Sequence, residues 1–120
     1  MEPAQGFTDL VVWQRAHQFV LSTYAATRLY PKEERYCLTS QFRRAAISIA
    51  ANIAESFRKR SVREKIRFLE IAEASLEECR YFLILSNDLG YALNEYQTPQ
   101  FEETSKILRS YVYQLRRSMS

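Results

Sequence analysis

Hydrophobic residues recur at three- and four-residue steps along most of the chain, which is the spacing of amphipathic α-helices. The first helix is predicted to run from about residue 8 to residue 29. Thr8 or Asp9 is predicted to cap its N-terminus, and Pro31 lies just beyond its end. Its core stripe is predicted to comprise Leu10, Trp13, Val20 and Tyr24.

Three further helices are predicted, over about 38–59, 62–89 and 99–117. Ser61 and Glu64 form the S-x-x-E pattern of a capping box at the start of the third helix. Gly90 suits its C-terminal stop. The fourth helix is expected to begin with Thr98 as its cap and Pro99 as its first residue. Its apolar face is predicted to comprise Phe101, Leu108, Tyr111, Val112 and Leu115.

Four helices with shortish connections predict an all-α fold, an antiparallel up-down-up-down four-helix bundle that forms one domain over residues 1–120. The third helix is apolar on two sides. One line comprises Leu69, Ala72, Leu76, Cys79 and Leu83, and the other comprises Phe68, Ile71, Ser75, Phe82 and Leu85. A helix of this kind is usually central or touches a second chain, which motivates the hypothesis of a homo-oligomer.

The second helix carries an ordered row of polar residues nearly opposite its apolar face. The predicted core face comprises Phe42, Ala46, Ile49, Ile53 and Phe57. The polar row comprises Gln41, Arg44, Ser48, Asn52 and Glu55. Serine and asparagine are poor helix formers, and alanines flank the row, so the interpretation favoured is a seam that hydrogen-bonds to a neighbouring helix or subunit. A plain solvent-facing surface and a ligand site are the alternatives.

Charge is distributed unevenly along the chain. The net charge is +3, but residues 31–67 carry ten Lys/Arg and four Glu, while residues 68–108 carry two Lys/Arg and eight Asp/Glu. If the helices alternate in direction, the junction of helices two and three and the end of helix four share one end of the bundle. The candidate nucleic-acid-binding residues at that end are Arg58, Lys59, Arg60, Arg63, Lys65, Arg67, Arg116 and Arg117. A cluster that serves solubility is the alternative.

The residue types needed for common catalytic and cofactor sites are missing. A di-iron site in a bundle needs two Glu-x-x-His pairs, and the chain has one histidine, His17, which we interpret as a boundary residue. There is no glycine-rich phosphate loop and no nucleophile elbow. We therefore expect no enzymatic activity, no metal and no cofactor. With no apolar run long enough to cross a bilayer and two widely spaced cysteines, Cys37 and Cys79, a cytoplasmic protein with reduced thiols and no membrane partner is expected.

Three stretches resemble a known family. They are "FTDLVVWQRA" at 7–16, "YPKEERYCLTSQFRRAAISIAANIAES" at 30–56 and "RFLEIAEASLEECRYFLILSNDLGY" at 67–91. Together they are similar to the four-helix bundle protein family, also called S23 ribosomal-protein-like or intervening-sequence proteins. Glycine is usual in that family where this chain has Cys37, Ser56 and Ala74. Without the glycine at 56, the second helix is expected to run on to Lys59 or Arg60.

The resemblance implies a bundle that assembles into a ring, commonly a pentamer. More distant relatives are accessory proteins of diversity-generating retroelements that bind nucleic acid and a reverse transcriptase. The function predicted first is therefore a non-enzymatic scaffold that oligomerises and binds RNA or DNA non-specifically through its basic end. The alternative is an oligomeric protein–protein interaction module without nucleic-acid binding, including an accessory role to a reverse transcriptase.

Overall fold

The structure is a computed structural model, and it describes residues 3–91 and 97–119. These residues form four long helices and no strand. The helices are α1 (Val11–Thr27), α2 (Leu38–Arg58), α3 (Val62–Asp88) and α4 (Gln97–Arg117), and the short 3-10 helices are η1 (Phe7–Asp9) and η2 (Lys32–Glu34). The all-α prediction is confirmed for the described residues. No helix within them is long and apolar enough to cross a membrane.

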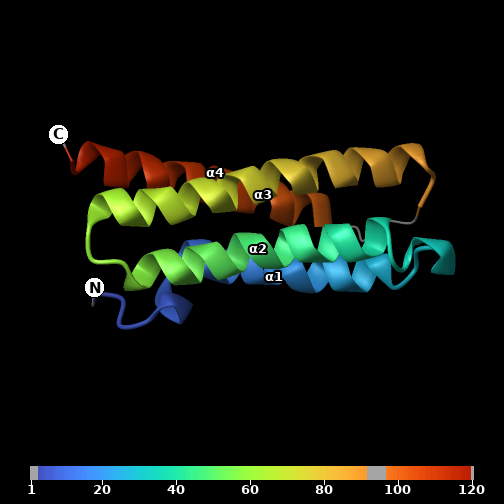
Figure 1. Ribbon diagram of the computed structural model, residues 1–120, viewed down its shortest axis with the longest axis horizontal. Helices are drawn as coiled ribbons and strands as arrows, with labels where there is room; N and C mark the ends of the chain where they lie inside the picture. Colours follow the sequence, from blue (N-terminus) through green and yellow to red (C-terminus); the bar gives the residue numbers. More distant parts are fainter. Residues whose placement is uncertain (1–2, 92–96, 120) are drawn as a thin grey trace.

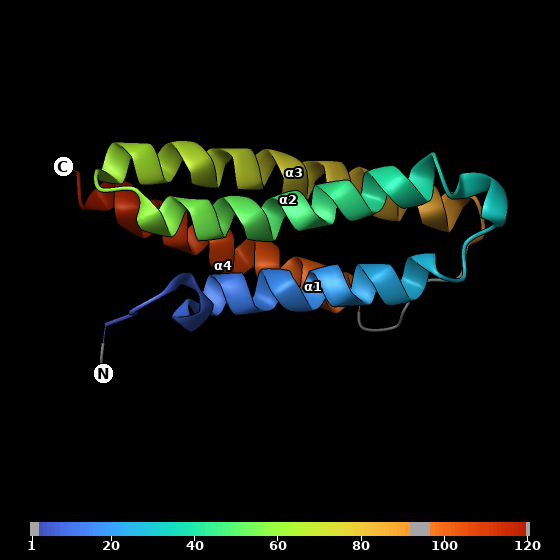
Figure 2. The same cartoon turned by 60° about the horizontal axis from the view of Figure 1, so that its bottom comes forward.

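Each long helix packs against the helices before and after it, and α4 closes the cycle against α1. Within the described residues, no Cα atoms of the diagonal pairs α1–α3 and α2–α4 come within 8 Å of each other. The helices run alternately along the long axis, so the N-terminal segment, the α2–α3 junction and the C-terminus lie at one end (Figures 1 and 2). The molecule measures 47 × 25 × 20 Å, so its length is close to that of α3, which at ~1.5 Å per residue is about 40 Å long.

The ends of α3 follow the predicted signals. Ser61 Oγ accepts a hydrogen bond from the Glu64 amide at 3.1 Å, which satisfies one of the free N–H groups of the first turn. At the other end Gly90 adopts φ of 76°, a conformation that favours glycine. The amides of Gly90 and Tyr91 then donate to the carbonyls of Asn87 and Ser86, which is the Schellman arrangement.

The predicted starts of α1 and α4 are wrong. Leu10, not Thr8 or Asp9, is the N-cap of α1, because η1 occupies the preceding residues. Helix α1 also ends two residues earlier than expected, at Thr27.

Helix α4 begins at Gln97 rather than Pro99, so Thr98 lies inside the helix and is not its cap. Gln97 is fully buried, and its Nε2 donates to Thr23 Oγ1 on α1 at 3.1 Å, which places the first turn of α4 in the core. Proline at position 99 costs no helical hydrogen bond, because it lacks an N–H and the N–H groups of the first turn have no partner within the helix. Helix α2 ends at Arg58, so it passes Ser56 as expected and stops one residue before Lys59.

The centre of the core is a chain of four phenylalanines, one from each helix. The ring of Phe19 on α1 lies 5.5 Å from Phe101 on α4 and 6.4 Å from Phe42 on α2. Phe42 in turn lies 5.6 Å from Phe82 on α3. The predicted core residues of α2 and α4 are confirmed, although Phe57, Tyr111 and Leu115 are only half-buried.

The predicted stripe of α1 is displaced. Leu10, Trp13, Val20 and Tyr24 are half-buried at the edge of the core. The buried face instead comprises Val12, Ala16, Phe19, Thr23, Ala26 and Thr27. The prediction assigned the side of α1 that contains Trp13 to the core because this residue is large and apolar. Trp13 instead packs against Phe7 and His17 at the surface.

Replacing Ser61 with alanine is expected to lower the free energy of unfolding by about 1 kcal/mol, because the Glu64 amide loses its acceptor. Urea denaturation measures this change. Ser110→Ala is the matched control, since Ser110 is exposed in the middle of α4 and alanine is the better helix former there. Equal stability of the two variants would contradict a capping role for Ser61.

Candidate nucleic-acid interface

The fold brings the eight predicted cations to one end of the bundle. Arg58 to Arg67 span the junction of α2 and α3, and Arg116 and Arg117 close α4 at the same end (Figure 1). An ion pair confirms the juxtaposition, because Arg116 Nη2 lies 2.8 Å from Glu70 Oε2 on the first half of α3. We call this group of eight cations the basic end.

Two lysines of the basic end are engaged in holding the junction together. Lys65 Nζ donates to the backbone oxygens of Ser56 and Phe57, at 3.3 and 3.0 Å, so it satisfies free carbonyls in the last turn of α2. Lys59 Nζ lies 3.3 Å from Glu55 Oε1 and 4.7 Å from the centre of the Phe68 ring. Their charge still contributes to the local field, but their ammonium groups already have partners.

Four arginines of the α2–α3 junction are exposed and make no ion pair with any residue that the structure describes. They are Arg58, Arg60, Arg63 and Arg67. Arg63 and Arg67 are one turn apart on α3, and so point to the same side of that helix. Sequence reasoning treated all eight cations alike. The structure separates these four, which can contact a ligand at no cost in internal contacts, from the two lysines.

One carboxyl group next to the basic end titrates abnormally. Burial raises the pKa of Glu73 above its ordinary value, and the neighbouring charge of Glu70 adds to that rise. Arg116 and Arg109 oppose the rise. Arg116 therefore lies close to two carboxyl groups of α3, those of Glu70 and Glu73.

The polar row of α2 makes its inner contacts within the same chain. Ser75 Oγ on α3 donates to Ser48 Oγ at 2.7 Å, and Asn52 Nδ2 donates to the Ser48 carbonyl at 2.9 Å. The middle of the row thus joins α2 to α3. The two ends of the row, Gln41 with Arg44 and Glu55, are exposed.

A pocket of ≈ 290 Å³ opens beside the first half of this row. Arg44 and Glu78 both line it, without an ion pair between them. The middle of the row therefore makes contacts within the protomer, and its two ends are exposed polar surface.

A shallow apolar hollow lies between η1, α1 and α2, with a volume of ≈ 260 Å³. Its α2 side consists of small and aliphatic residues, namely Ile47, Ala50, Ala51 and Ala54. On the α1 side His17 is exposed and stacks on Trp13, with ring centres 4.9 Å apart. His17 is therefore more exposed than the boundary position that the sequence predicted.

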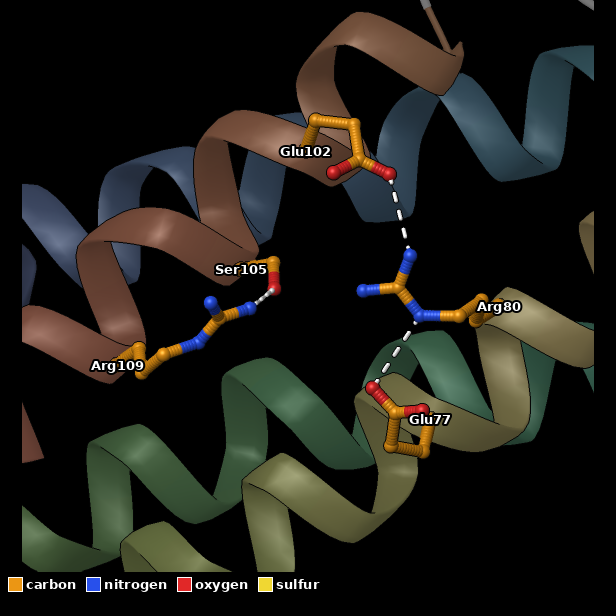
Figure 3. Close-up of polar contacts among 5 residues, drawn as sticks. All are labelled: Glu77, Arg80, Glu102, Ser105 and Arg109. Atoms are coloured by element: carbon orange, nitrogen blue, oxygen red, sulfur yellow. Dashed lines mark hydrogen bonds and ion pairs between the residues drawn. The ribbon is translucent and has the colours of Figure 1, made fainter.

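The sequence did not predict a group of ion pairs that joins α3 to α4, which Figure 3 shows. Arg80 on α3 pairs with Glu77 one turn earlier and with Glu102 on α4, each at 3.3 Å. Its guanidinium also lies 4.9 Å from the centre of the Phe101 ring. Farther along α4, Arg109 donates to Ser105 at 3.1 Å. The helical spacing of Glu77 and Arg80 was visible in the sequence, but the partner on α4 depends on the register of two helices.

The described residues contain no group of three or more potential ligands that could hold a metal ion. Burial raises the pKa of the Cys79 thiol well above its ordinary value, so this cysteine stays protonated. Neither Cys37 nor Cys79 forms a disulfide.

Comparison with known proteins agrees with this architecture. No curated protein matches the chain. A family model described as 23S rRNA-intervening sequence protein matches residues 8–116, which cover α1 to α4 almost completely. Because the match extends over far more than half of the sequence, the chain belongs to the 23S rRNA-intervening sequence protein family.

Proposed function

We propose that this protein is a non-enzymatic scaffold that self-associates and binds the phosphate backbone of nucleic acids, RNA first of all, through its basic end. The observation that carries the proposal is the set of four exposed arginines without ion pairs at the α2–α3 junction. Arginine forks match phosphate oxygens well. The name of the family, which refers to 23S rRNA, favours RNA over DNA as the first ligand to test.

Binding of this kind is expected to tolerate any sequence. Reading RNA bases generally requires aromatic rings on which unstacked bases can lie. The two rings nearest the junction are already covered by lysines, Phe57 by Lys65 at 5.6 Å and Phe68 by Lys59 at 4.7 Å. Phosphate contacts alone carry no sequence information. The proposal therefore predicts affinity without base preference.

Fluorescence anisotropy with a labelled mixed-sequence RNA of about 20 nucleotides tests the proposal. We expect the logarithm of the association constant to fall linearly with the logarithm of the salt concentration, by about 0.7 for each phosphate contacted on a single strand. A second RNA of different sequence serves as the control and should bind equally well. Binding that is absent at low salt, or that does not weaken as salt rises, would refute a phosphate-binding role.

Self-association is supported by apolar surface that one protomer leaves uncovered. The outer side of α3 exposes Ile71, Tyr81 and Ile84 to 44%, 58% and 54%. On another side of the bundle lies the hollow lined by Ile47 and three alanines. An interface between two different surfaces of the protomer generates a ring when the rotation between copies closes. A homo-oligomeric ring, a pentamer as the family resemblance implies, would repeat the basic end around one rim and multiply its charge.

The polar row of α2 gives a test of self-association that does not involve nucleic acid. Replacing Asn52 with alanine removes its hydrogen bonds to Ser48 within α2 and is expected to lower the melting temperature. A lower proportion of oligomer as well would place the row in the interface between copies. Gln114→Ala, at an exposed position of α4, is the control. Light scattering after size exclusion measures the mass. If Asn52→Ala changes neither property, the row is not part of an interface.

The second candidate is an oligomeric protein–protein interaction module without a nucleic-acid partner, such as an accessory to a reverse transcriptase. The apolar hollow between α1 and α2 favours it, because the hollow carries almost no polar surface for a nucleic acid to contact. Oligomers that do not bind RNA at any salt concentration would favour this second candidate over the first.

A further inference from the structure

A second cationic site lies at the end of the bundle opposite the basic end. The turn from α1 through η2 into α2 encloses a pocket of ≈ 260 Å³. Its lining includes four cations and two threonines: Arg28, Lys32, Arg35, Arg43, Thr27 and Thr39. We infer that this pocket binds a phosphate group, either free or at the end of a nucleotide.

The cations of the pocket lack ion-pair partners among the residues that the structure describes. No carboxylate lines it, and its four cations form no ion pair with any described residue. The turn does carry Glu33 and Glu34. Glu34, however, is engaged elsewhere, since its Oε2 accepts from the Tyr91 hydroxyl at 2.5 Å and its Oε1 accepts from the Leu38 amide at 3.4 Å. Between α3 and α4, by contrast, Arg80 is paired with two glutamates.

Arg43 is held in place by its neighbours. Its Nε donates to Thr27 Oγ1 at 2.8 Å, and its guanidinium lies 4.4 Å from the centre of the Tyr24 ring. Thr27 is fixed in turn, since its hydroxyl donates to the Thr23 carbonyl at 2.7 Å. These contacts occupy the Nε and one face of the guanidinium. The two terminal nitrogens have no partner among the described residues and remain available for two parallel hydrogen bonds to phosphate oxygens.

The walls of the pocket are anchored to the bundle. Tyr30, which also lines it, is buried, and its hydroxyl donates to Ser86 Oγ on α3 at 2.6 Å. Burial raises the pKa of Tyr30, so that hydroxyl stays a donor. Tyr91 packs against Tyr30 with ring centres 5.0 Å apart and fixes Glu34 beside the turn. A pocket already shaped before binding loses little entropy when the ligand arrives.

The size of the pocket limits the ligand. Sites for drug-sized molecules usually have ~300–1,000 Å³, and ≈ 260 Å³ falls just below that range. A phosphate or pyrophosphate group fits this volume better than a whole cofactor. The inference does not depend on nucleic-acid binding at the basic end, because the two sites lie at opposite ends of the bundle and share no residue.

Calorimetric titration of the whole protein at constant ionic strength tests the inference, with inorganic pyrophosphate as the probe. Saturable binding is expected, and Arg35→Gln should weaken it about tenfold, the effect of one charge-assisted hydrogen bond. Arg35 is exposed, so this variant should fold normally. Arg43→Lys, which keeps the charge but loses the fork and the bond to Thr27, should also weaken binding. Lys106→Gln removes the same charge from the middle of α4, outside both cationic sites, and should bind pyrophosphate as the unaltered protein does.

Two further probes separate the sources of the phosphate. A dinucleotide with a 5′-phosphate and the same dinucleotide with a 5′-hydroxyl are titrated alongside pyrophosphate. Binding of pyrophosphate alone supports a free phosphate ligand, and binding of the phosphorylated dinucleotide as well supports a nucleotide end. The inference is overturned if pyrophosphate does not bind saturably, if Arg35→Gln binds it as tightly as Lys106→Gln does, or if both dinucleotides bind equally well. None of these results would affect the RNA titration at the basic end.

Discussion

Replacing Arg60 and Arg63 together with glutamine is expected to weaken RNA binding by roughly tenfold or more at low salt, because two phosphate contacts are lost from the α2–α3 junction. For each protomer in contact with RNA, the salt dependence should also become shallower by about 1.4 in the log–log slope for a single strand. Both side chains are exposed and make no ion pair with described residues, so the fold should not change. Anisotropy titrations at several salt concentrations measure both effects.

The matched control replaces Lys106 and Arg109 with glutamine. This pair removes the same two charges from the middle of α4, which the proposal does not place in contact with RNA. If the two double variants lose the same affinity, total charge rather than the basic end governs binding, and the proposed interface is wrong.

Replacing Phe42 with alanine is expected to destabilise the protein by about 3–5 kcal/mol, the usual effect of deleting a buried aromatic ring. Phe42 is fully buried and links the rings of Phe19 and Phe82, so its loss opens a cavity at the junction of α1, α2 and α3. At this chain length the melting temperature should fall by on the order of 10–20 °C. Thermal denaturation followed by circular dichroism at a fixed protein concentration measures the change.

Tyr36→Ala is the control for this variant. Tyr36 is 88% exposed on the α1–α2 turn, so its truncation should change the free energy of unfolding by no more than about 0.5 kcal/mol. A Phe42→Ala protein as stable as Tyr36→Ala would show that the chain of four phenylalanines is not the centre of the core.

The sequence was most informative where one local signal decides the structure. The face of α2 containing Phe42, Ile49 and Ile53 follows from spacing alone, and all three residues are fully buried. Ser61 and Gly90 end their helices as predicted because capping depends on a few adjacent residues. The face of α1 was misjudged because Trp13 is large and apolar but covers the edge of the bundle, whereas the buried face includes small and polar residues such as Ala16 and Thr23.

For the candidate sites, too, some features followed from the sequence and others depended on how the helices pack. That the cations of the α2–α3 junction share an end with Arg116 followed from helix count and direction alone. That Lys65 serves the last turn of α2, leaving the arginines available, depends on how closely α3 approaches α2. The opposite pocket was invisible in the sequence, because Arg43 reaches it from α2, across a turn of ten residues from Arg28 to Cys37.

The most direct test of the central claim is light scattering after size exclusion, with and without a mixed pool of RNA and DNA, at low and at high salt. The proposal predicts an oligomer of defined mass at both salt concentrations that gains nucleic acid at low salt and releases it at high salt. A monomer at micromolar concentration that carries no nucleic acid at either salt concentration would contradict it.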